Sequence, residues 1–176
     1  MAPADSLGIL SRALDQLGDL LVHVRPDRLD RPTPCSDWTL GELADHVVAS
    51  PTKFAAALRG EQPDWSAQTE NRETGWATAF RSSADDLMHL WHQGDADDRS
   101  DPDWQTAEFA VHAWDLSRAL GRPTSELDPA VAERGLDFMR NNLHADVRGD
   151  AFGPEQPAPA DGDAYDVLAA FAGRAV

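Results

Sequence analysis

The chain has a single cysteine, Cys35, among its 176 residues, so it cannot form a disulfide within itself. Its first residues, Met1 to Asp5, lack the basic segment followed by an apolar stretch that characterises a secretory leader. No apolar run approaches the roughly 20 residues that a membrane-spanning helix needs, and the run from Leu20 to Val24 is interrupted by His23. We therefore expect a cytoplasmic protein that does not span a bilayer.

Basic residues are also scarce: 15 Lys and Arg stand against 31 Asp and Glu, which gives a formal net charge of -16. This acidity disfavours a phosphate backbone or an anionic membrane surface as a partner, so we expect no nucleic-acid or membrane binding. The chain also lacks a glycine-rich phosphate loop and a Gly-x-Ser-x-Gly elbow. Its hydrophobic content of 41% is ordinary for a folded protein, and its length predicts one domain over residues 1–176.

The sequence has no strand pattern, and helical periodicity dominates it. Over residues 5–24, leucines and a valine recur at steps of three and four, which predicts a helix with one apolar seam. A second helix is predicted from Thr39, which has capping-box spacing to Glu42, to about Arg59, and we expect Pro51 to kink or interrupt it. A third helix is expected over residues 73–92, with an apolar stripe, and Gly94 ends it.

Two further helices begin with an aspartate followed by proline, the pattern of an N-cap and first helical residue. They are predicted over residues 101–120 and 128–143, and a short last helix over 164–172. Counted from Asp95, the acidic segment has Ser100 at the sixth position and Thr106 at the twelfth, where a calcium loop requires glycine and glutamate. We interpret it as a solvated loop that caps the fourth helix. The chain is therefore predicted to be all-α.

Two of the six histidines are predicted to face the interior of such a bundle. His46 lies at the flank of the apolar stripe of the second helix, and His112 lies among apolar residues of the fourth. Glu108 precedes His112 by one helical turn. Two ligands at i and i+4 plus a third from a neighbouring helix are typical of an open metal site in a helical bundle. The remaining histidines are predicted to face solvent, apart from one at a helix end whose place stays open: His23, His89, His92 and His144.

An alternative interpretation of the same spacing has no metal. Glu108 and His112 would then form an ion pair on a helix surface, and His46 would bond a carbonyl in an ordinary core. Spacing alone leaves both interpretations open. Two histidines and one carboxylate suit catalytic zinc (Zn2+) with an open fourth position, and also Ni2+, Fe2+ or Mn2+.

Other residues near these motifs allow two interpretations each. Asp115 lies close to one turn beyond His112, where it either orients the histidine or bonds a neighbouring loop or Arg118. Cys35 precedes a helix start, but no histidine is near it in sequence, which favours a partly buried structural thiol over a nucleophile. Three tryptophans are interpreted as core residues rather than as walls of a pocket: Trp38, Trp104 and Trp114.

Three segments together resemble a known family. Residues 34–39 read Pro-Cys-Ser-Asp-Trp-Thr and lead into Leu-Ala-Asp-His-Val-Val at 43–48, and residues 108–121 read Glu-x-x-x-His-Ala-Trp-Asp-Leu-Ser-Arg-Ala-Leu-Gly. This combination resembles the actinobacterial mycothiol-dependent maleylpyruvate isomerase group of the DinB/YfiT-like superfamily. The tail, residues 152–174, is similar to that of small single-domain metal-binding members.

The resemblance implies a DinB-like four-helix bundle with an extra C-terminal helix and an irregular tail. It implies a zinc or similar divalent ion held by His46, Glu108 and His112. It further implies that a small thiol of the mycothiol type is the co-substrate and attacks a small electrophilic substrate. The resemblance also implies that the isomerase that gives the group its name has an additional C-terminal domain. We do not expect that domain in this chain, and we therefore do not expect isomerisation of maleylpyruvate itself.

Two functions remain open at this point. One is a metal-dependent thiol transferase or isomerase-like enzyme of unknown acceptor. The other is a non-catalytic metal-binding bundle with a role in stress, sensing or partner binding. By analogy with related bundles, a homodimer is one expected assembly.

Overall fold

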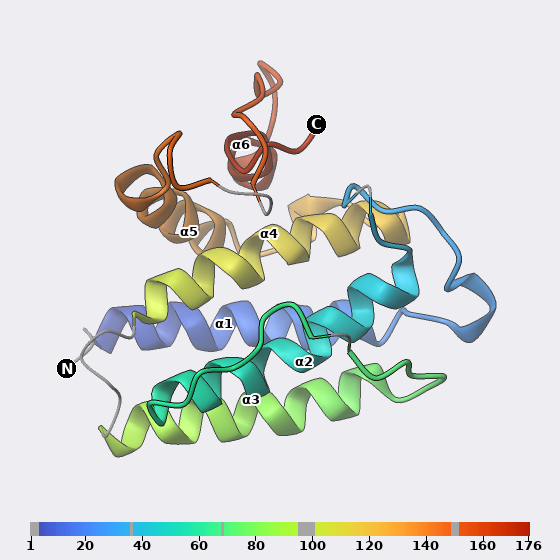
Figure 1. Cartoon of the computed structure of the whole chain (residues 1–176). Coiled ribbons are helices and arrows are strands. Elements are labelled where there is room, and N and C mark those ends of the chain that lie inside the picture. Colours follow the sequence, from blue (N-terminus) through green and yellow to red (C-terminus); the bar gives the residue numbers. More distant parts are fainter. Residues whose placement is uncertain (1–3, 36, 68, 95–100, 149–151) are drawn as a thin grey trace.

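The computed structural model describes residues 4–35, 37–67, 69–94, 101–148 and 152–176, and within these ranges the chain is helical throughout its regular structure (Figure 1). The α-helices are α1 (Ala4–Leu21), α2 (Leu40–Leu58), α3 (Trp76–Gln93), α4 (Pro102–Leu120), α5 (Pro129–Asn142) and α6 (Ala164–Phe171). Short 3-10 turns occupy Pro26–Arg28 and Thr124–Glu126. The one extended pairing in the described ranges is an isolated bridge between Pro32 and Thr39. The predicted all-α class is confirmed.

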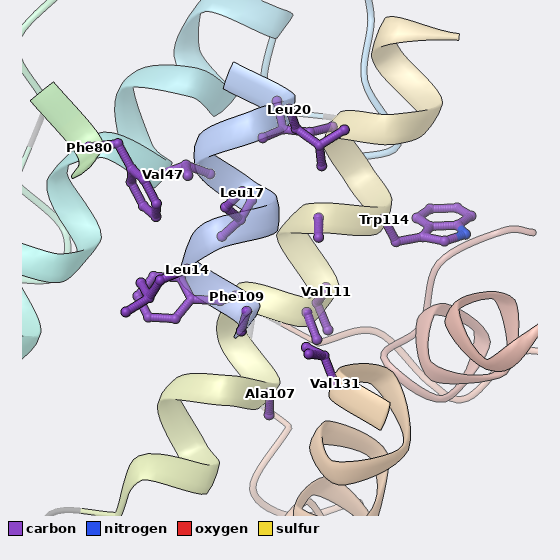
Figure 2. Close-up of a cluster of buried hydrophobic side chains, with 14 of the residues drawn as sticks. Leu14, Leu17, Leu20, Val47, Phe80, Ala107, Phe109, Val111, Trp114 and Val131 are labelled. Atoms are coloured by element: carbon purple, nitrogen blue, oxygen red, sulfur yellow. The ribbon is translucent and has the colours of Figure 1, made fainter. Parts of the chain in front are cut away.

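Helices α1 to α4 pack as a four-helix bundle, and α5 and α6 cover the outer side of α4 (Figure 1). Within the bundle, the ring of Phe109 on α4 contacts the rings of Phe54 and Phe80. On the outer side, Val111 of α4 faces Val131 of α5 (Figure 2). Fully burying one such apolar side chain contributes about 1.5–3 kcal/mol. The arrangement is the DinB-like bundle with C-terminal additions that the sequence predicted.

Helix α4 is the central element, because it is buried on almost every side. Its buried residues are Pro102, Gln105, Thr106, Ala107 and all of 109–117. A helix with so little solvent-facing surface has to carry its polar side chains into the interior, where each of them needs a partner. Three polar side chains of α4 take part in the candidate site or its surroundings: Glu108, which is partly exposed, and the buried His112 and Asp115.

The predicted helix ends agree with the structure where a side chain or glycine determines them. Thr39 and Glu42 form the expected capping box at α2. Asp101 caps α4, and Gly121 ends it in the left-handed conformation with φ +70°. Of the acidic segment interpreted as a capping loop, residues 95–100 lie outside the described ranges.

Three expectations about helix bounds are corrected. Helix α1 ends at Leu21 rather than at residue 24, because the amides of His23 and Val24 bond the carbonyls three residues back and tighten the chain into a turn. Helix α3 begins at Trp76 rather than at residue 73, because Gly75 has φ +78°. Pro51 does not interrupt α2, which runs through it to Leu58; Pro51 is buried, and packing outweighs the hydrogen bond that proline cannot donate.

The four histidines that were not assigned to the interior are all exposed. Exposure is the predicted state of His23, His89 and His92, and it settles the place of His144, which follows α5 and which the sequence left open. Among the described helices, none combines the length and the apolar character that crossing a membrane requires.

Candidate metal centre

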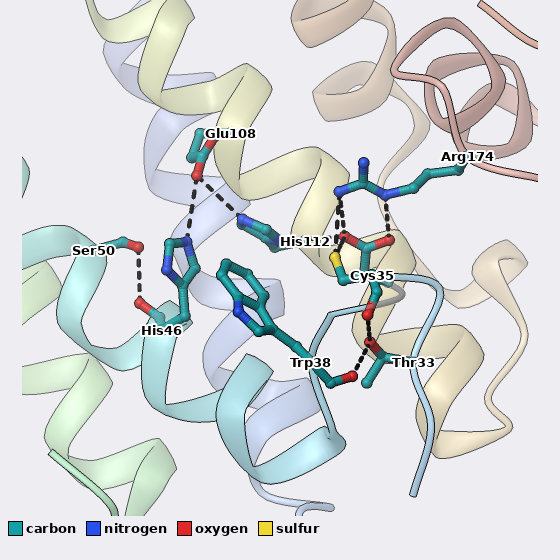
Figure 3. A network of polar contacts seen from close by, with 9 residues as sticks. Thr33, Cys35, Trp38, His46, Ser50, Glu108, His112 and Arg174 are labelled. Atoms are coloured by element: carbon teal, nitrogen blue, oxygen red, sulfur yellow. Dashed lines mark hydrogen bonds and ion pairs between the residues drawn. The ribbon is translucent and has the colours of Figure 1, made fainter. Parts of the chain in front are cut away.

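His46 on α2 and Glu108 and His112 on α4 converge on one point between the two helices (Figure 3). Each contributes one potential ligand atom, and these atoms all lie within 4.8 Å of one another. Glu108 Oε1 lies 3.1 Å from His112 Nε2 and 3.6 Å from His46 Nε2. The fold therefore brings together the three residues singled out from helical spacing.

The three side chains differ in exposure in a way that leaves the group accessible. The side chain of His112 is 7% exposed, whereas those of His46 and Glu108 are 19% and 25% exposed. The ring of Trp38 lies against His46 with a centroid distance of 4.4 Å and covers one side. The group is thus closed at His112 and reaches solvent at Glu108 and His46.

The charges of the three side chains are set by their burial and by one another. Burial raises the pKa of Glu108, but the adjacent His112 and His46 lower it more, so the pKa lies below its usual range and Glu108 is ionised. Burial lowers the pKa of His46 and favours its neutral form. In the described part of the chain, no arginine or lysine pairs with Glu108. The cationic partner of the half-buried Glu108 is therefore His112 itself, and a divalent ion that replaced the Nε2 proton of His112 would compensate the same carboxylate.

The alternative without a metal agrees with the structure in one part, since Glu108 and His112 lie 3.1 Å apart as an ion pair, and differs in two others. His112 is buried rather than on a helix surface. His46 Nε2 is also buried, and this nitrogen forms no hydrogen bond with any described residue, whether a carbonyl or another group. A buried imidazole nitrogen without a partner is costly. The donor set fits a divalent ion, and nothing in it selects one metal over another.

The opposite side of the His112 ring faces a second carboxylate. His112 Nδ1 lies 3.2 Å from Asp115 Oδ2, and Asp115 is fully buried. Burial raises the pKa of Asp115, but His112 and Arg174 lower it more, so it is ionised. Burial lowers the pKa of His112, but Glu108 at Nε2 and Asp115 at Nδ1 raise it more, so without a metal the ring carries both protons; a bound ion would take the place of the Nε2 proton while Asp115 keeps the Nδ1 proton. Asp115 thus contacts the histidine, and Arg118 instead stacks over Trp114 at 5.6 Å.

Cys35 lies in the same cluster, although sequence reasoning found no histidine near it. Its Sγ donates to Asp115 Oδ2 at 3.1 Å and lies 3.4 Å from Arg174 Nη2. Burial raises the pKa of Cys35, which keeps the thiol protonated as a donor. Thr33 Oγ1 bonds the carbonyls of Cys35 and Trp38 and so ties this loop together. No local sequence pattern indicates these contacts.

Cys35, His112 and Asp115 form a second group with the spacing of metal ligands. Here, however, Arg174 already supplies a positive charge: its Nε and Nη2 lie 2.9 and 3.0 Å from the two oxygens of Asp115. A cation added to this group would have to displace a buried guanidinium. The group of His46, Glu108 and His112 is therefore the better candidate.

The remaining candidates separate into core and surface. Trp114 is buried and donates to Asp166, as expected of a core residue. Trp104 is 42% exposed, so its interpretation as a core residue is wrong. It lies in the first turn of α4, against the ring of Phe54. Asp45, next to His46, is buried but accepts from Trp76 Nε1 at 2.8 Å, and so holds α3 rather than the site.

The fold and the site define a class: a DinB-like helical bundle with a candidate metal centre between α2 and α4. Residues 10–101 match the family model described as the mycothiol maleylpyruvate isomerase N-terminal domain. The chain is also 34% identical to two proteins of Mycobacterium tuberculosis, named uncharacterized protein MT0763 and uncharacterized protein Rv0738, over 98% of its own length and 99% of theirs.

The chain belongs to the mycothiol maleylpyruvate isomerase N-terminal domain family. The matched range includes His46 and ends before Glu108 and His112. No solved structure matches the chain at a significant level.

Proposed function

We propose that this protein binds a divalent metal ion through His46, Glu108 and His112 and uses it to activate a small thiol of the mycothiol type for transfer to a small electrophile. The observation that supports the metal centre is the half-buried, ionised Glu108 beside a buried Nε2 of His46 that forms no hydrogen bond, with no lysine or arginine paired to that carboxylate among the described residues. Zinc is the first expectation, and Ni2+, Fe2+ or Mn2+ suit the same donors.

The family supports the thiol part of the proposal, because its name refers to mycothiol. A bound divalent ion stabilises a thiolate at neutral pH, where most of a free thiol is protonated. The side chains of the protein supply two imidazole nitrogens and one carboxylate, and Asp115 holds the Nδ1 proton of His112. Three protein donors leave a further position for an exogenous thiol, on the side where Glu108 is exposed.

A second function, metal binding without catalysis, is favoured by one observation. The ring of Trp38 covers His46 and lies 6.1 Å from the ring of His112, which restricts access from that side. A bundle of this kind would serve stress, sensing or partner binding.

Cobalt substitution distinguishes the two functions. We expect one Co2+ per chain in the wild type and a thiolate-to-cobalt charge-transfer band on addition of mycothiol. A tightly bound cobalt ion whose spectrum is indifferent to mycothiol would favour the non-catalytic bundle. Absence of cobalt and zinc binding would refute the metal centre.

A further inference from the structure

Arg174 lies beyond the last helix, yet its guanidinium reaches the interior of the molecule beside α4 (Figure 3). It binds both oxygens of Asp115, at 2.9 and 3.0 Å, and its side chain is only 12% exposed. Asp115 in turn faces His112 Nδ1 at 3.2 Å. A continuous chain of polar contacts therefore runs from the C-terminal tail to a candidate metal ligand.

The turn after α6 directs Arg174 towards α4. Gly173 has φ +89°, and its amide bonds the carbonyl of Ala170 while the amide of Arg174 bonds that of Ala169. This is the hydrogen-bond pattern of a Schellman motif, which ends a helix and reverses the chain. A Cβ at position 173 would lie 2.6 Å from the carbonyl oxygen of Gly153, so only glycine fits there.

The charge of Arg174 accounts for the state of the cluster. Asp115 has no exposed surface, and a buried carboxylate is costly unless a cation and hydrogen bonds compensate for it. Arg174 provides the cation, and Cys35 donates a third hydrogen bond to the same oxygen that faces His112. Because Arg174 and Cys35 both donate to Asp115 Oδ2, this oxygen is held in place and accepts from His112 at the Nδ1 side of the ring.

We propose that Arg174 is a positioning residue for metal binding: through Asp115 it fixes His112 with Nδ1 as donor and Nε2 directed at Glu108 and His46. The inference rests on the metal centre proposed above. It makes the C-terminal turn part of the site, although this turn lies outside the range that matches the family model.

The test compares two arginines that hold the same tail. Arg148 Nη1 donates to the carbonyls of Gly153 and Phe171 at 2.8 and 2.7 Å, and its guanidinium stacks on the ring of Phe171. No contact joins it to Asp115 among the described residues. Zinc affinity of the full-length variants Arg174→Gln and Arg148→Gln is measured by competition with a chromophoric chelator.

Loss of a group that orients a metal ligand typically weakens binding about 10- to 100-fold, and we expect this loss in Arg174→Gln. Arg148→Gln should bind zinc as the wild type does. Equal losses in both variants would show that tail stability alone is involved and would overturn the proposal, as would an unchanged affinity in Arg174→Gln.

A spectroscopic readout reports the contact itself. In the zinc-loaded wild type, the Nδ1 proton of His112 should give a low-field NMR resonance, because it is shielded from exchange by Asp115. We expect this resonance to be lost or shifted in Arg174→Gln and retained in Arg148→Gln.

A milder variant covers the case in which Arg174→Gln does not fold, as judged by circular dichroism. Arg174→Lys keeps the charge but loses the two-point geometry of the guanidinium, so its zinc affinity should fall between the other two. Wild-type affinity together with an unchanged His112 resonance in Arg174→Lys would then contradict the proposal. A wild-type protein that binds no zinc would refute the metal centre itself. A wild type that binds zinc independently of Arg174 would refute only the role of Arg174.

Discussion

The two nitrogens of His112 face different surroundings. On the Nε2 side lie Glu108 and His46, both partly exposed, and within the described ranges no lysine or arginine pairs with the carboxylate, whose cationic partner is His112 itself. On the Nδ1 side lie Asp115 and Arg174, closed from solvent and balanced in charge. A contact between the histidine and a carboxylate thus occurs in two different regions. The Nδ1 side, where Arg174 balances Asp115, is a support that fixes the ring, and the Nε2 side is the place where a cation that replaced the His112 proton would compensate Glu108.

The largest effect is expected from His112→Ala, because this residue belongs to both sides. Zinc binding in proteins amounts to about 10–16 kcal/mol, so one of three or four ligands accounts for roughly 3–5 kcal/mol, about 100-fold to several thousand-fold in affinity. Helicity should change little, since the apolar core elsewhere is intact. Metal content of the purified protein and its circular dichroism measure the two effects.

The control for this variant is His89→Ala, which removes an exposed imidazole from α3. It should keep full zinc stoichiometry. Full stoichiometry in His112→Ala as well would contradict the assignment of the ligand.

A smaller loss is expected from Glu108→Gln, which keeps the shape of the side chain and removes its charge. A charged partner interacts roughly twice as strongly as a neutral one, so about half of one ligand's contribution should be lost, about 10- to 60-fold in zinc affinity. Isothermal titration of zinc into the metal-free variant measures this loss. Glu133→Gln, at an exposed position of α5, is the matched control and should bind zinc like the wild type; equal affinities in both variants would place the metal away from Glu108.

A smaller effect again is expected when the support is displaced rather than removed. Gly173→Ala should destabilise the fold by about 1–3 kcal/mol through its left-handed conformation, and the overlap with Gly153 should move Arg174 and weaken zinc binding by about 10-fold at most. Gly121→Ala is the control: φ is +70°, but no atom lies near the added Cβ. Thermal unfolding should show a loss of stability in both variants, and the zinc titration a loss of affinity in Gly173→Ala only. Unchanged affinity in Gly173→Ala would mean that the turn does not act on the site.

The Nε2 side could be predicted from the sequence, whereas on the Nδ1 side only Asp115 could be offered, as one of two interpretations, and its partners Arg174 and Cys35 could not. Glu108 and His112 are one turn apart, and the apolar stripes determine which way they and His46 point, so local periodicity is sufficient. The contact between Arg174 and Asp115 spans 59 residues, and that between Cys35 and Asp115 spans 80. Such contacts depend on how α6 and the loop before α2 dock on α4, which no local pattern encodes.

The helix bounds follow the same division. Caps with a defined side-chain bond, such as Thr39 with Glu42, were predicted at the right residue. The end of α1 and the start of α3 were not, because backbone turns after Leu21 and at Gly75 determine them. The apolar pattern continues past both points and carries no signal for the change.

The smallest effect, and the one that tests the comparison most directly, is expected from Cys35→Ser. If the cation binds on the Nε2 side, a serine hydroxyl can still donate to Asp115, and zinc affinity should stay within about 3-fold, because one neutral hydrogen bond is exchanged for another. The cobalt-substituted wild type should show no thiolate band before a thiol is added. The contrary result is a thiolate band that is present in the wild type and disappears in Cys35→Ser. It would locate the metal among Cys35, His112 and Asp115. The guanidinium of Arg174 would then have to leave the carboxylate of Asp115, which it now neutralises.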